Sequence, residues 1–307
     1  MEKILKIQRR FFRNEKNQFL DTIEEKLTEY NYEFERKFFN NIFKSVNLET
    51  KCDKPDFIFI AHYDTGTIIP FWINWLTKLV GMNNIVLVMI FLYFLQEIIA
   101  NTHSKISSVI FAIICISLLS IFIPNKKNFD DNTSGIIALL ELAKKFKKNG
   151  IDNVKFIFAD NEEFGLIGSN AHKKYLEKEQ LIPSHCKVIS IDCVGGKGEM
   201  PLIVQNSKSE YAKIFQREIQ KEFELCQSIN TIIPFSDNYS FRKYGALNIS
   251  FASRAVVSSG YYIPNVHSIK DDKIDLDKIE KLTNILVKII NNINSMQEFK
   301  INEQNNF

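Results

Sequence analysis

The sequence predicts an α/β fold, a single three-layer domain in which a central mixed, largely parallel sheet lies between helices. Short apolar runs rich in β-branched and aromatic residues occur at residues 56–64, 154–160 and 187–195. Amphipathic stretches with helical spacing occur at residues 135–148 and 279–293. Alternating strands and helices indicate a sheet covered on both faces. A chain of 307 residues is long enough to bury such a core.

The elements follow in order from the N-terminus. Residues 6–30 carry apolar positions at helical spacing among many charges, which predicts an amphipathic helix on the domain surface. The run DFIFIAHYD at 56–64 predicts a buried strand that ends in His62 and Asp64. Open α/β sheets place their sites at such strand ends. The C-terminal residues 297–307 are expected to fray.

Residues 79–99 and 106–123 interrupt this pattern because they are nearly continuous Ile, Leu, Val, Phe and Met. Each run approaches the roughly 20 residues that a membrane-spanning helix needs. The polar connector at 101–105 suits a tight turn between antiparallel helices, so we expect a transmembrane helical hairpin. The predicted division is a catalytic domain in two parts, 1–78 and 125–307, with the hairpin at 79–124 inserted between them.

The flanking charges predict the orientation of this hairpin. Lys78, Lys126 and Lys127 lie on the domain side, against Lys105 in the connector. By the positive-inside rule, we expect a multi-pass membrane protein with a cytoplasmic catalytic domain and the lipid bilayer as a partner of the hairpin. The alternative is a pair of buried core helices or a re-entrant cap, because both runs are short and the first contains Glu97.

Composition excludes some functions. A net charge of +3 from 39 basic and 36 acidic residues gives no strong field for binding nucleic acid. Five cysteines without CxxC spacing favour free thiols in a reducing compartment. Charges interrupt every apolar run at the N-terminus, so no secretory signal peptide is expected there.

Five short segments rich in His, Asp and Glu follow the predicted strands or lie in loops between elements. They are 62–64 (HYD), 130–135 (DDNTSG), 161–169 (NEEFGLIGS), 191–193 (IDC) and 266–268 (VHS). Alone, an HxD pair or a strand-terminal Asp more often caps a helix or accepts a hydrogen bond, and adjacent loop acids are usually solvated. Together, two imidazoles and several carboxylates fit a pair of divalent ions, since zinc accepts both nitrogen and oxygen.

These segments resemble the co-catalytic zinc aminopeptidases of clan MH, metallopeptidase family twenty-eight, which also contains glutamate carboxypeptidase and the glutaminyl cyclases. The resemblance runs from about Asp56 to the C-terminal helix, the apolar runs excepted, and DDNTSG and EEFGLIGS are its most specific parts. It implies the phosphorylase/hydrolase-like zinc exopeptidase fold, two Zn²⁺ ions and peptide substrates.

The resemblance also implies roles for individual residues. The metal ligands would be His62, Asp131, Glu163, Asp192 and His267, with Asp131 bridging both metals. Glu162 would be the general base. Asp64 would orient the imidazole of His62, as metal-bound histidines usually require.

Further residues are candidates for a substrate pocket. The stretch 234–245 resembles the family's SDHxxF segment, which makes Asp237 and Phe241 candidates, although Asn238 replaces the commoner His. Tyr261 and Tyr262 precede His267 and could hydrogen-bond a reaction intermediate or simply pack. His103, His172 and His185 lack such contexts and are expected at the surface.

The expected function is a membrane-anchored aminopeptidase that hydrolyses N-terminal residues by metal-activated water. A glutaminyl-peptide cyclase of the same family is the first alternative, because the segment from His267 to Asp272 resembles an HTxDD ending. A non-catalytic receptor or scaffold that kept the fold is the second.

Overall fold

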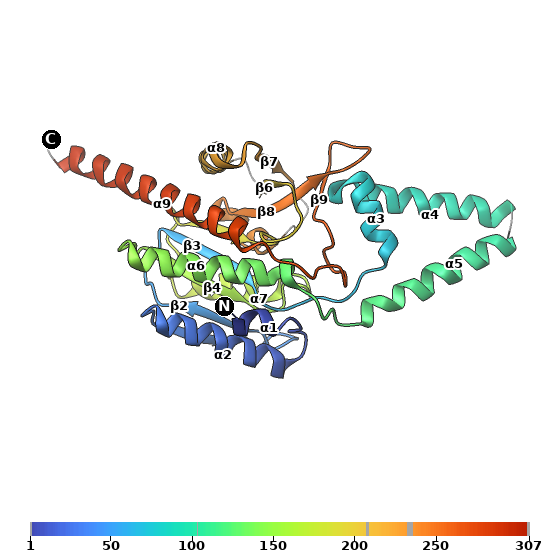
Figure 1. Ribbon diagram of the computed structural model, residues 1–307, viewed down its shortest axis with the longest axis horizontal. Helices are drawn as coiled ribbons and strands as arrows, with labels where there is room; N and C mark the ends of the chain where they lie inside the picture. The colour runs from blue at the N-terminus through green and yellow to red at the C-terminus, as the bar shows by residue number, and fades with distance from the viewer. Residues whose placement is uncertain (1, 103, 207–208, 232–235, 306–307) are drawn as a thin grey trace.

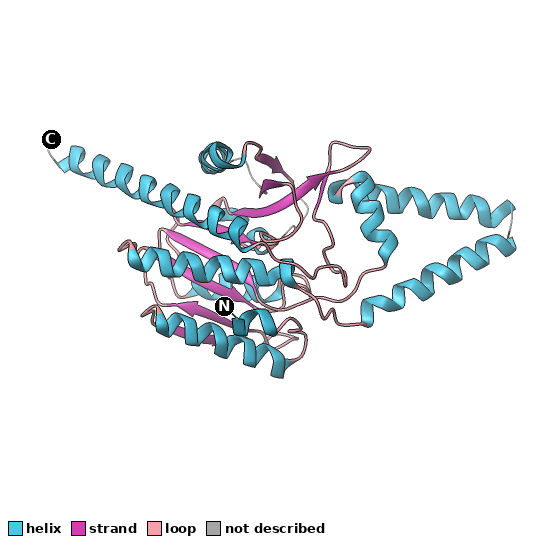
Figure 2. Ribbon diagram, in the orientation of Figure 1, coloured by secondary structure: helices cyan, strands magenta, loops and turns pink. Residues whose placement is uncertain are grey.

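The computed structural model describes residues 2–102, 104–206, 209–231 and 236–305, and it has a mixed central sheet with helices on both faces (Figures 1 and 2). The order of the strands across the sheet is β1-β2-β4-β3-β5-β8-β6-β7, and β9 pairs with β8. The strands are β1 (Phe34–Phe38), β2 (Val46–Thr50), β3 (Phe57–His62), β4 (Val154–Ala159), β5 (Lys187–Ile191), β6 (Met200–Gln205), β7 (Gln227–Asn230), β8 (Leu247–Arg254) and β9 (Tyr261–Tyr262).

The centre of the sheet is parallel and its flanks are mixed. β4, β3, β5 and β8 pair in parallel, whereas β2 joins β4, and β6 joins β8, in the antiparallel sense. The predicted α/β fold with a mixed central sheet is therefore confirmed. The parallel centre brings the carboxyl ends of β3, β4 and β5 to one edge.

Helices cover both faces of the sheet. β3 presents alternate apolar side chains to the two faces, so each face needs a covering layer. Phe57 and Phe59 pack in the larger core cluster, to which helices on one face contribute. Ile58 and Ile60 face a smaller cluster that includes Leu176 of the helix on the other face. The helices are α1 (Glu2–Lys6), α2 (Arg13–Glu29), α3 (Phe71–Val80), α4 (Ile85–Thr102), α5 (Ser104–Leu118), α6 (Gly135–Lys148), α7 (Ile167–Lys178), α8 (Glu210–Phe223) and α9 (Leu276–Asn305).

The expectation that residues 79–124 cross a membrane is wrong. Among the residues that the structure describes, none of the helices combines the length and apolarity that a bilayer span requires. Both apolar runs are divided. Leu79 and Val80 belong to α3, and a 3-10 turn at Met82–Asn84 separates them from α4. The predicted multi-pass membrane location, and the orientation inferred from the flanking lysines, are wrong with it.

Helix length gives the physical reason. α4 has 18 residues and would extend about 27 Å, and α5 has 15 and would extend about 22 Å. A bilayer core is about 30 Å thick. α4 also carries Gln96 and Glu97 and ends in Asn101 and Thr102. The two helices contact each other and project from the body of the molecule (Figure 1).

Candidate metal centre

The predicted ligands come together at the edge where the parallel strands end. His62 is the last residue of β3, Glu163 lies in the loop after β4, and Asp192 directly follows β5. Asp131 lies in the loop before α6, and His267 lies in the loop after β9. Strands that pair in parallel deliver their following loops to the same place, which is why segments so far apart in sequence meet here.

The carboxylate of Asp131 lies between the two imidazoles. Its Oδ1 is 3.4 Å from His62 Nε2, and its Oδ2 is 3.7 Å from His267 Nδ1. Asp192 Oδ1 is 3.6 Å from His62 Nε2, and Glu163 Oε2 is 3.5 Å from His267 Nε2. The side chains form three groups of potential ligands, of which two are His62 with Asp131 and Asp192, the first set, and Asp131 with Glu163 and His267, the second set; the third is His62 with Glu162 and Glu163. Asp131 belongs to the first set and to the second.

Asp64 connects the first set to the loop that carries the paired glutamates. Its side chain is fully buried, and its Oδ1 lies 3.6 Å from His62 Nδ1. The backbone N–H groups of Glu162 and Glu163 donate to the two oxygens of Asp64, at 3.0 and 3.3 Å. One carboxylate therefore holds the backbone from which the glutamates project and lies beside the imidazole of His62.

The loop that carries Asp131 is held by its neighbours in the sequence. Asn132 Oδ1 accepts from the N–H groups of Gly135 and Cys193, and Asn132 Nδ2 donates to the carbonyl of Ile191. A Cβ on Gly135 would lie 2.2 Å from Asn132 Oδ1, so only glycine fits. These contacts place Asp131 beside the end of β5, which Asp192 directly follows.

The second support of this loop was not foreseen from the sequence. Asp271 accepts hydrogen bonds from the backbone N–H groups of Asp130 and Asp131, at 2.8 and 3.1 Å. The acidic pair that follows His267 was the only signal for it. Because Asp271 lies four residues after His267, it links the loops of two potential ligands.

The chemistry of the site fits a bound metal. Glu163 Oε1 and Asp192 Oδ1 are buried without a hydrogen-bond partner among the described residues. Buried polar atoms normally have partners, so these atoms point to a group that would satisfy the cluster. Neutral imidazole nitrogen and carboxylate oxygen are ligands that zinc accepts. The acidic and histidine side chains could therefore hold a metal ion.

Charge repulsion in the cluster leads to the same conclusion. Burial raises the pKa of Glu162 well above its ordinary value, and the neighbouring Glu163 raises it further while His62 opposes the shift. Burial likewise raises the pKa of Glu163, and Asp131 adds to it. Burial lowers the pKa of His62, but Glu162 and the other carboxylates outweigh it, so the net shift is upward. A bound cation would relieve this repulsion.

A small cavity of about 190 Å³ opens beside the second set. Its lining includes Gly66, Thr67, Ile69, Phe164 and the two potential ligands of that set. A Cβ on Gly66 would lie 2.6 Å from Glu163 Oε2 and 2.8 Å from His267 Nδ1. The absence of a side chain at Gly66 therefore keeps this side of the centre open.

The candidate pocket residues lie in different environments. Asp237 is fully buried near Glu162, and burial raises its pKa to about 7. Phe241 is fully buried in the smaller core cluster. Tyr261 and Tyr262 form β9 and are half-buried. The negative charge of Asp237 helps to raise the pKa of Glu162, whereas Phe241 serves the core.

The remaining histidines are not all at the surface. His172 is fully buried, and its Nε2 lies 2.9 Å from Glu49 Oε2. The surface expectation for His172 is therefore wrong. His185 is exposed and pairs with Asp56, and His103 lies outside the described residues.

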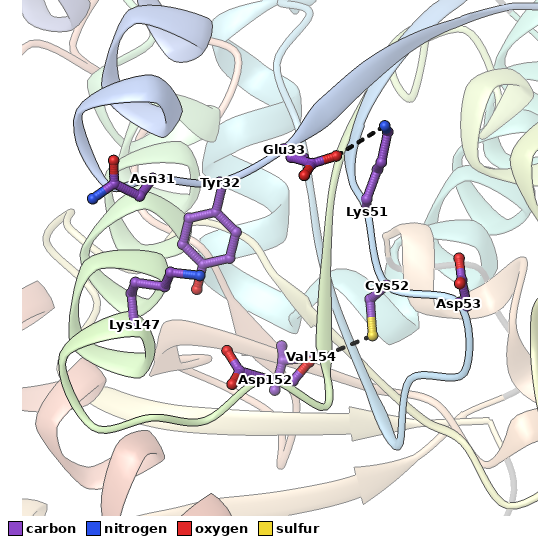
Figure 3. Close-up of a pocket in the computed structure, with 9 residues that line it drawn as sticks. All are labelled: Asn31, Tyr32, Glu33, Lys51, Cys52, Asp53, Lys147, Asp152 and Val154. Atoms are coloured by element: carbon purple, nitrogen blue, oxygen red, sulfur yellow. Dashed lines mark hydrogen bonds and ion pairs between the residues drawn. The ribbon is translucent and has the colours of Figure 1, made fainter.

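Two of the larger cavities that lie elsewhere can be placed on the fold. One of about 400 Å³ is lined by Tyr32, Lys51, Cys52 and Val154 among others, and Figure 3 shows the ion pair between Lys51 and Glu33 at its wall. Val154 begins β4, so this cavity lies at the opposite end of that strand from the glutamate loop. The other, about 550 Å³, lies between α3, α4 and α5 and is mostly apolar.

Comparisons with known proteins show the family and the fold of this chain. The family model described as peptidase family M28 matches residues 122–290, which is more than half of the chain. The chain belongs to peptidase family M28. No curated protein sequence matches it significantly.

Solved structures share the fold of this M28 protein at low sequence identity. A glutaminyl cyclase from Bacteroides thetaiotaomicron bound to N-acetylhistamine is 14% identical, with 94% of each chain covered and a TM-score of 0.64. A leucine aminopeptidase precursor from the same organism is 13% identical, with 94% of this chain and 93% of that one covered and a TM-score of 0.62. A Zn-dependent exopeptidase from Parabacteroides distasonis is 14% identical, covers 92% and 93%, and has a TM-score of 0.60.

Proposed function

We propose that this M28 protein is a two-zinc aminopeptidase. The observation that carries the proposal is the sharing of Asp131 between two sets of potential ligands. A carboxylate whose two oxygens face different imidazoles, at 3.4 and 3.7 Å, suits a bridge between two cations. His62, Asp131 and Asp192 would hold one zinc ion, and Asp131, Glu163 and His267 would hold the other.

When bound, zinc would supply Lewis acidity and lower the pKa of a coordinated water. Glu162 is placed to accept and transfer a proton of that water. Its Oε2 lies 4.0 Å from His62 Nε2, and Asp64 holds its backbone N–H. We infer that Glu162 takes a proton from the attacking water and passes it to the amine that leaves when the peptide C–N bond breaks.

An exopeptidase is favoured by the size of the cavity beside the centre. At about 190 Å³ it has room for little of a substrate beyond one end. Ile69 and Phe164 line it together with polar groups. We propose that this space receives one end of a peptide. We assign the N-terminal end because the chain resembles the aminopeptidases of the family.

A glutaminyl-peptide cyclase is the second candidate because a cyclase shares the fold over 94% of both chains. In that reaction the N-terminal amine attacks the side-chain amide carbon and ammonia leaves. A glutaminyl peptide distinguishes the two candidates. An aminopeptidase releases free glutamine from it, whereas a cyclase releases ammonia and a cyclised peptide.

The decisive experiment is a substrate panel on the purified full chain. Amino-acid amides and peptides with free or blocked N-termini are incubated with zinc and with a chelator, and the products are identified by mass spectrometry. We expect release of N-terminal residues from unblocked substrates only, and loss of that activity with the chelator. Zinc binding without turnover of any substrate would favour a non-catalytic scaffold.

A further inference from the structure

A buried arginine from the N-terminal segment lies beneath the candidate metal centre. The side chain of Arg10 is fully buried. Its Nε donates to the carbonyl of Tyr63, and its Nη1 donates to Thr133 Oγ1 at 2.9 Å. Its backbone N–H donates to Thr65 Oγ1 at 2.9 Å. The guanidinium also lies over the ring of Phe19, 4.4 Å from its centroid.

These contacts join two segments that carry potential ligands. Tyr63 stands between His62 and Asp64, so Arg10 holds the backbone of the HxD segment. Thr133 is two residues beyond Asp131. The planar guanidinium can reach both acceptors at once, which the single ammonium of a lysine cannot do in the same geometry.

The charge of Arg10 acts on the same groups. Burial lowers the pKa of Arg10 to about 10, so the side chain is still cationic at neutral pH. Asp64, Asp131, Asp271 and Glu163 oppose that shift, which means that their negative charges interact with the guanidinium. The buried guanidinium is therefore a fixed positive charge beside this cluster of carboxylates.

A second buried cation of the same segment supports the third loop. Lys16 in α2 is 4% exposed, and its Nζ donates to Asp160 Oδ1 and Asn161 Oδ1, both at 2.6 Å. Asp160 and Asn161 directly precede Glu162. The segment of residues 8–16 therefore contacts each of the loops after β3 and β4 and the loop before α6.

We propose that Arg10 is a positioning residue for the metal centre. It holds the strand end with His62 and Asp64 against the loop with Asp131, and it supplies a permanent positive charge beneath the ligands. The inference rests on the proposed zinc site, but it concerns a residue outside the segment that matches the family.

The test is zinc affinity, measured on chelator-stripped full-length protein by titration with Zn²⁺ in competition with a metal indicator. The variants are Arg10→Met and Arg10→Lys. The control is Arg9→Met, because Arg9 is 40% exposed and pairs with Glu15, which is not one of the potential ligands. Folding is checked by circular dichroism and size-exclusion chromatography. Hydrolysis is followed at limiting and at saturating zinc.

We expect Arg10→Met to weaken zinc binding about 100-fold and Arg10→Lys about 10-fold, within the range found for partners of metal ligands. Excess zinc should restore most of the kcat of both variants. Arg9→Met should bind zinc within about twofold of the parent. If Arg10→Met does not fold, Arg10→Lys decides the question.

A folded Arg10 variant that binds zinc as tightly as the parent would overturn the inference, even if its Tm were lower, because the role would then be structural only. Equal weakening in Arg9→Met would overturn it as well. Failure of the parent protein itself to bind zinc would instead refute the proposed function, so the two failures are distinguishable.

Discussion

At the residue scale, Glu162 can join a group of potential ligands with His62 and Glu163, but it belongs to neither of the two sets that share Asp131. We expect Glu162→Gln to lower kcat about 10²–10⁴-fold, since general acid–base assistance has about that value. Zinc affinity should change little because the five proposed ligands stay in place. Steady-state kinetics and zinc titration measure the two effects. Glu179→Gln, at an exposed residue after α7, is the matched control. Parental kcat in Glu162→Gln would remove Glu162 from the mechanism.

Asp130 predicts how the metal-free protein responds to pH. Burial raises the pKa of Asp130 to about 7, and Asp131 and Asp192 add to the shift. A carboxyl whose folded pKa exceeds its unfolded pKa is destabilising when ionised. The Tm of chelator-treated protein should therefore rise as pH falls from about 8 to 6, and part of that rise should vanish in Asp130→Asn. An identical pH dependence of Tm in the two proteins would contradict this.

Much of the site could be predicted from sequence because strand ends and short motifs mark it. His62, Glu163 and Asp192 each follow an apolar run, and the parallel order of those strands brings them together. Asp271 and Arg10 could not be predicted in the same way. Both act through contacts with backbone groups of distant loops, and no local pattern records such contacts.

At the element scale, α6 was predicted with its observed bounds because its apolar positions recur with helical spacing. β2 was missed because only two residues of its sequence VNLET are apolar, too few to mark a buried strand, yet every residue is buried. Leu48 packs in the larger core, whereas Asn47 and Glu49 face His172 on the other side. Buried polar partners from a distant helix are not visible in a local pattern.

The apolar runs at 79–124 misled the prediction at the same scale. Composition suggested two spans, but a 3-10 turn before α4 and another at Leu119–Phe122 shorten both helices. Hydropathy averages over a window and does not register where a helix starts or ends. Helix length decided the outcome here.

The position of α4 and α5 leads to a deletion experiment. Their contacts are largely with each other, with α3 and with the short turns at their ends. We expect replacement of residues 85–118 by a flexible linker of about ten Gly and Ser residues to leave zinc binding within about twofold of the parent. Calorimetric titration of both proteins checks this. A folded deletion variant that binds no zinc would show that these helices help to form the centre.

At the scale of the whole molecule, the sheet acts as a frame that brings distant loops to one edge. β3 precedes α3, α4 and α5 in the sequence, and β4 follows them. Both strands belong to this sheet, in which β3 pairs with β4 and β5. Asp131 lies between the loops because Asn132 ties it to the end of β5 and Asp271 ties it to the loop of His267. The fold thus positions the potential ligands, and the N-terminal segment contacts the loops that carry them.

The most direct test of this account is the number of zinc ions bound per chain, measured by elemental analysis and native mass spectrometry after stripping and reloading. We predict two ions for the parent and fewer for His267→Ala, which keeps His62, Asp131 and Asp192 intact. A parent that binds one ion or none after reloading would contradict the shared role of Asp131.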